Sequence, residues 1–75
     1  MLRKVFLTFP ENLIQDPVLY ELAKTFNVRT NIRGASVTQQ LALVALEIDG
    51  EEPDVAAAIG HLEQMDVQVE LLGDA

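Results

Sequence analysis

Apolar and polar residues alternate along four separate stretches of the chain, a pattern typical of half-buried β-strands. The alternation predicts strands over residues 3–9, 28–37, 41–49 and 67–72. Two intervening stretches instead repeat their apolar residues every three or four positions, which predicts an α-helix with one buried face. Those stripes are Leu19, Leu22, Ala23 and Phe26 in the first helix, and Val55, Ala58, Ile59 and Leu62 in the second. The chain therefore reads strand, helix, strand, strand, helix, strand.

Local signals place the ends of these elements. Asp16 precedes Pro17, and we expect its carboxylate to cap the first helix, because proline suits the first helical position. Asn27 is a plausible left-handed stop for that helix. Gly34 lies inside the second strand and indicates either a β-bulge or the close approach of another group. Pro53 marks the start of the second helix.

This order of elements predicts an α+β protein with the ferredoxin-like split βαβ fold (βαββαβ), a four-stranded antiparallel sheet with two helices on one face. We expect residues 1–75 to form one domain with the strand order 4-1-3-2. If Val44, Leu46 and Ile48 face the helices, their neighbours face away from them. An exposed apolar patch is then predicted, and such patches mark interfaces or ligand sites. Its members are Phe6, Leu41, Leu43 and Ala45. The alternative is a register displaced by one residue, or surface apolar residues without a role.

Polar side chains of the second strand are predicted to share this uncovered face. Arg29, Asn31 and Arg33 alternate with the apolar residues of the strand. An arginine can hold a carboxylate through two hydrogen bonds, and an asparagine amide both donates and accepts. A small amino-acid-like ligand would suit this set. The alternative is a solvated edge strand, on which arginines prevent aggregation.

Composition and charge narrow the classes of partner. Apolar residues make up 49% of the 75 residues and aromatic residues only 5%, which suits a small aliphatic core. A second copy could add burial to so short a chain, so we expect a homodimer. The net charge of −7 opposes binding to nucleic acids and anionic membranes. Because we find neither a secretory signal nor a stretch of about 20 apolar residues, we expect a cytoplasmic protein without membrane insertion.

The candidate chemistry for catalysis is sparse. His61 is the single histidine, and Glu63 and Asp66 are weak partners for a metal site. The acidic residues before and within the second helix, Glu51, Glu52 and Asp54, are better interpreted as stabilising its dipole. The sequence holds no cysteine, and no nucleophile–base pair can be argued from it. We therefore expect neither an enzyme nor a bound cofactor. RNA binding is also disfavoured, because the third strand offers no aromatic side chain for stacking.

At Asn31-Ile32-Arg33, and again over residues 43–50, 58–59 and 67–71, the chain resembles the NIL domain family. The resemblance implies a ferredoxin-like, ACT-like regulatory domain that pairs with a second copy and binds methionine. Such domains occur at the C-terminal end of methionine ABC importer ATPases, fused to iron–sulfur ferredoxin segments, and as short free-standing proteins. Since the chain has neither an ATPase motif nor a cysteine, the resemblance implies the free-standing kind.

The resemblance also assigns residues. Asn31 matches the family asparagine expected to face the ligand, and Ile32 and Gly34 match its flanking positions. Arg33 replaces a leucine that the family prefers, so its role follows only from its own chemistry. Ala42 and Asp66 each stand where the family favours glycine. We thus predict a ligand site of Asn31, Ile32, Arg33 and Gly34 in a regulatory domain. The alternative is a ligand-free interaction or dimerisation module that uses the uncovered face.

Overall fold

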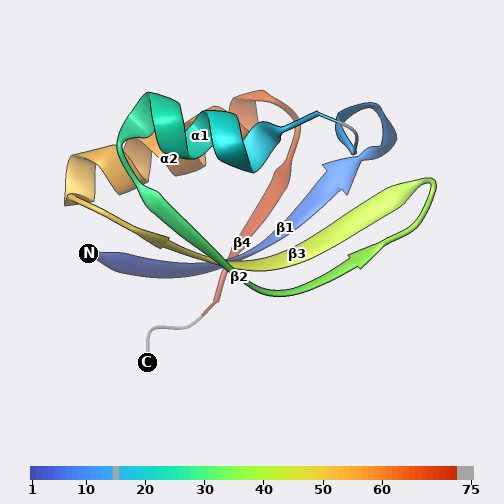
Figure 1. Ribbon diagram of the computed structural model, residues 1–75, viewed down its shortest axis with the longest axis horizontal. Coiled ribbons are helices and arrows are strands. Elements are labelled where there is room, and N and C mark those ends of the chain that lie inside the picture. Colours follow the sequence, from blue (N-terminus) through green and yellow to red (C-terminus); the bar gives the residue numbers. More distant parts are fainter. Residues whose placement is uncertain (15, 73–75) are drawn as a thin grey trace.

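The computed structural model describes residues 1–14 and 16–72, and its elements follow the predicted order. They are β1 (Leu2–Pro10), a 3₁₀ turn η1 (Glu11–Leu13), α1 (Val18–Phe26), β2 (Arg29–Val37), β3 (Leu41–Asp49), α2 (Glu52–Gln64) and β4 (Gln68–Leu71). The strands form one antiparallel sheet in the order β2-β3-β1-β4. Both helices lie on the same side of the sheet, and within residues 1–14 and 16–72 no helix covers the opposite side (Figure 1). The predicted split βαβ fold and strand order are confirmed.

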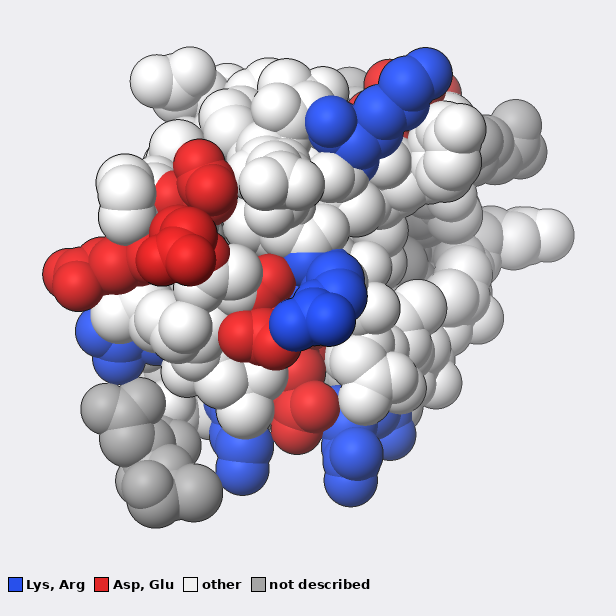
Figure 2. Space-filling model, turned by 60° about the vertical axis from the view of Figure 1, so that its left-hand side comes forward, with Lys and Arg blue, Asp and Glu red and all other residues white. Residues whose placement is uncertain are grey.

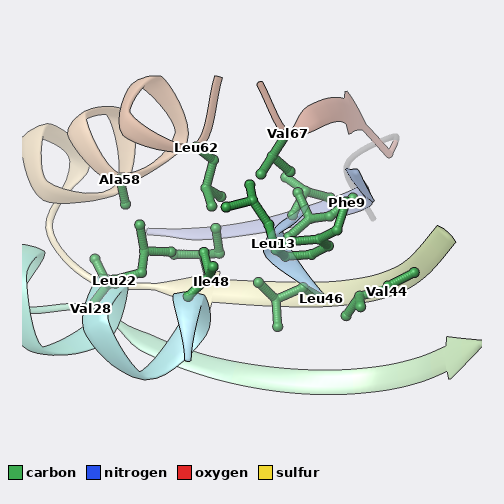
Figure 3. Packing of buried hydrophobic residues seen from close by; sticks show 14 of the residues in the cluster. Phe9, Leu13, Leu22, Val28, Val44, Leu46, Ile48, Ala58, Leu62 and Val67 are labelled. Carbon is green, nitrogen blue, oxygen red and sulfur yellow. The ribbon is translucent and has the colours of Figure 1, made fainter. Parts of the chain in front are cut away.

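The core lies between the sheet and the two helices. Alternate residues of β1 and β3 point into it, and Leu7, Leu46 and Ile48 have exposed fractions of 1% or less. Leu22 of α1, together with Ala58 and Leu62 of α2, packs against these strands from the helix side (Figure 3). Each fully buried aliphatic side chain contributes roughly 1.5–3 kcal/mol to folding. The packing of the sheet against the helices therefore stabilises the fold, and the side chains on the other side of the sheet remain available for contacts with other molecules.

The start of α1 differs from the prediction. The helix begins at Val18 with Pro17 as its N-cap residue, and no side chain caps it. Asp16 instead accepts a hydrogen bond through its backbone carbonyl from the Val18 amide, at 2.8 Å. The expected capping by the Asp16 carboxylate is wrong, because Pro17 occupies the cap position that the prediction gave to Asp16. The helix ends as predicted at Asn27, whose φ of 54° is left-handed.

A β-bulge interrupts β2 at the position that its glycine indicated. Ile32 lies opposite Leu46 of β3, but the next partner pair is Gly34 with Ala45, so Arg33 is the additional residue. A side chain at Gly34 would meet nothing within 4 Å. Of the two readings of this glycine, the bulge is therefore confirmed, and no close approach demands a glycine there.

Both ends of the sheet carry exposed apolar side chains on the helix side. The outer part of the β2–β3 hairpin projects beyond α1 (Figure 1), and Val37 near its tip is 62% exposed. Strand β4 is one residue shorter at each end than predicted, and its Leu71 is 60% exposed.

The turn before β4 contains Asp66 at a φ of 67°, a conformation that glycine adopts without strain.

Candidate functional site

The uncovered face of the sheet consists of the strand side chains that point away from both helices. In β3, Ala42, Val44, Leu46 and Ile48 are buried on the helix side, which turns the residues between them to the bare side. Phe6 of β1 lies in register with Ala45, and Leu43 lies in register with Thr8. The register on which the prediction depended is confirmed. It brings Phe6, Leu41, Leu43 and Ala45 together as one apolar patch across the two central strands.

Charged and amide side chains occupy the end of this face near the start of β2. Arg29 Nη2 lies 3.0 Å from Asp49 Oδ2, and Asn31 Nδ2 donates to Glu47 Oε1 at 3.4 Å. Arg33 Nε lies 4.0 Å from the other Glu47 carboxylate oxygen, Oε2. Lys4 of β1 lies opposite Glu47 in the register. We call these six residues the polar end of the uncovered face: Lys4, Arg29, Asn31, Arg33, Glu47 and Asp49.

The contacts of the polar end contribute little to stability. The Arg29 and Arg33 side chains are 86% and 64% exposed. Ion pairs in such positions contribute about 0–1 kcal/mol, because water screens them and long side chains lose entropy in forming them. The Asn31–Glu47 hydrogen bond is also near the upper limit of length. These groups can therefore exchange their present partners for a ligand at a small energetic cost.

The four residues of the predicted ligand site divide between the two faces. Asn31 lies opposite Glu47, and Arg33 contacts Glu47, so both are on the uncovered face. Gly34 lies opposite Ala45, which is a member of the apolar patch, so Gly34 adjoins the patch. Ile32 lies opposite the buried Leu46, which places it on the helix side, where it is 55% exposed. A ligand beside Asn31 would therefore not share a face with Ile32.

The sequence reasoning missed three members of the polar end, Lys4, Glu47 and Asp49. Glu47 is 20% exposed and is the group that Asn31 and Arg33 have in common. The signal for it was present, because the alternation that turns Leu43 and Ala45 outward also turns Glu47 outward. Lys4 follows from the same alternation in β1. Their closeness to Asn31, however, depends on the strand order and register.

His61 lies outside this face, on α2. It is exposed, and its ring centre lies 5.1 Å from that of Phe26, which packs against the core from α1. Within residues 1–14 and 16–72, no group of three or more histidine, cysteine, aspartate or glutamate residues could hold a metal ion. Neither helix in this part of the chain is long and apolar enough to cross a membrane.

Comparison with known proteins decides the family. The sequence model of the NIL domain matches residues 3–71. The chain belongs to the NIL domain family. This NIL domain is 38% identical, over 71 residues, to the methionine import ATP-binding protein MetN of Sodalis glossinidius (strain morsitans). It is 34% identical over 71 residues to MetN of Escherichia coli (strain K12). Each alignment covers 89% of the chain but 21% of the relative, so the chain spans about a fifth of their length.

A solved structure supports the fold. The C-terminal domain of an ABC transporter ATP-binding protein from Enterococcus faecalis superimposes with a TM-score of 0.82 at 22% identity. The superposition covers 97% of this chain and 86% of that one.

The backbone at Asp66 accounts for one family preference. Asp66 stands where the family favours glycine, and its φ of 67° is in the left-handed region that glycine adopts without strain.

Proposed function

We propose that this NIL domain is a non-catalytic regulatory domain that binds an amino acid, with methionine as the first candidate, on its uncovered sheet face. One observation carries the proposal: Asn31 belongs to the polar end of that face, and its partner Glu47 is followed on the same face by Ala45 of the apolar patch. The relatives that share the family are named for methionine import. We also propose that the domain acts as a dimer in the cytoplasm.

The polar end suits the charged atoms of a free amino acid. The Glu47 carboxylate can accept hydrogen bonds from the ligand's ammonium group, and the Asn31 side-chain oxygen can accept a further one. The Arg33 guanidinium is planar and carries its donors as a fork, so it can hold the ligand's carboxylate through two bonds. Cation and anion sites side by side select a zwitterion over a singly charged molecule.

The apolar patch suits the side chain of such a ligand. Gly34 and Ala45 lie in register next to the polar end, and neither has a bulky side chain. A side chain of the ligand can therefore lie across them toward Phe6, which is half-buried and in register with Ala45. Burying apolar surface there contributes about 25 cal/mol per Å². A flexible, unbranched side chain such as that of methionine fits this arrangement.

Calorimetric titration of the full chain with methionine, and then with the other amino acids, tests the proposal. We expect heat for methionine, and an affinity at least about tenfold lower in Asn31→Ala, because a hydrogen bond to a charged group contributes about 1.5–3 kcal/mol. Asn12→Ala is the matched control, since Asn12 is exposed in η1, away from the polar end. It should bind like the wild type. If no amino acid gives heat or moves any backbone chemical shift, the proposal is wrong.

A further inference from the structure

The outer half of β2 is an open strand edge. Among the described strands, β2 lies at the margin of the sheet and pairs with β3 alone. Its first half carries Arg29, Arg33 and the bulge, features that discourage further pairing. Residues 34–37, beyond the bulge, contain neither a charge nor a proline, and all of them are exposed. The backbone of this half can therefore accept another strand.

The hydrogen bonds of the hairpin show which backbone groups face this edge. The Thr38 amide donates to the Leu41 carbonyl at 2.8 Å, so this pair is bonded toward β3. Hydrogen-bonded and non-hydrogen-bonded pairs alternate along an antiparallel ladder. Val37 and Ala35 are therefore non-hydrogen-bonded positions, and their N–H and C=O groups point away from β3. An added strand can bond to the donor and the acceptor of both residues.

An apolar cleft lies beside this edge on the helix side. It has a volume of about 240 Å³ and lies between the hairpin, η1 and the first turn of α1. Its sheet wall includes a row of partners across three strands, Val37, Ala42 and Phe9. Tyr20 of α1 also lines the cleft and is 65% exposed. An apolar side chain that enters the cleft would thus cover surface of Val37 and Tyr20 that water now contacts.

The edge and the cleft together specify the shape of an occupant. Residues directly opposite each other in an antiparallel pair point to the same face, so the side chain opposite Val37 would lie on the helix side, at the cleft. We propose that an extended peptide segment of another protein adds to the outer half of β2 and places an apolar side chain in the cleft. Main-chain hydrogen bonds then supply affinity, and the cleft supplies specificity. The peptide would lie beside β2 in the plane of the sheet and leave the uncovered face open to a ligand.

Charge favours a basic peptide over an acidic one. The chain has a net charge of −7. In Figure 2, basic and acidic side chains alternate along the lower margin, whereas a separate acidic group lies higher at the left. Among the described residues that line the cleft, the charged one is Asp16, which is exposed. A lysine or arginine near the apolar residue of the peptide would meet this carboxylate, and an acidic residue there would be repelled.

Hydrogen exchange of the full chain, with no amino acid present, tests the strand addition. The probes are capped synthetic peptides of about six residues, a usual strand length, in which valine, leucine or phenylalanine alternates with threonine. Each has a lysine at its N-terminal end, because an antiparallel strand begins opposite the hairpin tip. With peptide at about ten times its dissociation constant, exchange of the Ala35 and Val37 amides should slow about tenfold, since only the free fraction exchanges. The Gly34 and Ser36 amides, which face β3, should keep their rates.

Matched variants and peptides separate strand addition from other modes of binding. Val37→Pro removes a donor from the edge, where proline is tolerated, so it should fold by circular dichroism and bind about tenfold more weakly. Val37→Thr keeps the donor and should bind within about threefold of the wild type. A peptide N-methylated on one set of alternate residues should bind and one methylated on the other set should not, because only one set faces β2. Asp16→Asn should weaken binding of the lysine peptide but not of a peptide with glutamine in its place.

Three results would overturn the proposal. One is the absence of saturable protection with every peptide of the panel at millimolar concentration; another is equal binding of the two N-methylated peptides. The third is protection of the Ala35 and Val37 amides as the chain alone is concentrated, which would make a second copy the occupant. Because these measurements contain no amino acid and concern the edge of the sheet, a failure here is distinct from a failure of methionine to bind.

Discussion

Two leucines three positions apart in β3 should differ sharply in their contribution to stability. Leu46 is 1% exposed in the core, whereas Leu43 is half-buried on the uncovered face. Truncating a fully buried leucine to alanine removes its transfer free energy and leaves a cavity, at a cost of about 3–5 kcal/mol. A domain of this length has a total stability of about 4–11 kcal/mol. Leu46→Ala should therefore remove about a quarter of it or more, and Leu43→Ala only about 1 kcal/mol.

Urea unfolding followed by circular dichroism measures the loss of unfolding free energy in both variants, at concentrations low enough to keep the chain monomeric. Thermal unfolding gives a second measure. For a domain of this size each kcal/mol lowers the melting temperature by about 4–8 °C, so Leu46→Ala should melt at least about 12 °C below the wild type. Leu43→Ala should melt within about 8 °C of it. Equal losses in the two variants, or a larger loss for Leu43→Ala, would refute the assignment of the two faces.

Gly60→Ala should stabilise the protein by about 0.5–1 kcal/mol in thermal unfolding, because alanine favours the helix interior and its Cβ meets nothing within 4 Å. Gly50→Ala should instead destabilise it, since a Cβ there would lie 3.1 Å from Cγ1 of Val28; a stabilised variant would contradict that contact. Asp66→Gly should raise the unfolding free energy by up to about 1 kcal/mol through relief of its left-handed φ of 67°, and an unchanged midpoint in urea would count against this. Asn31→Ala should change stability by less than about 0.5 kcal/mol, because the hydrogen bond of Asn31 to Glu47 is long and exposed, so a marked drop in melting temperature would show a structural role instead.

The arrangement of the uncovered face was predictable in part. Alternation in β1 and β3 suffices to separate Leu46 from Leu43, because successive side chains of a strand point to opposite faces. The glycine in β2 indicated the bulge, but only the pairing with β3 shows that Arg33 is the additional residue and remains beside Glu47. Alternation also turned Glu47 outward, yet a single strand cannot reveal which residues of its neighbours lie beside it.

The capping prediction failed for a local reason. An aspartate followed by a proline is compatible with two helix starts. In one, the aspartate is the N-cap residue and the proline is the first helical residue; in the other, the proline itself is the N-cap residue. In the structure Pro17 holds it and Asp16 contributes only its carbonyl. Backbone geometry at this turn, rather than residue preference, decides between the two starts.

The sequence by itself determined the order of the elements and the helix-facing side of each central strand, since these follow from periodicity. Its motifs also carry the resemblance to the NIL domain family, which the family model confirms. Only the tertiary structure decided that Asn31, Arg33, Glu47 and Lys4 come together from three strands, and that Ile32 lies on the other side of the sheet. These features depend on register between strands distant in the chain, which is fixed by the packing of the whole core and not by any one segment.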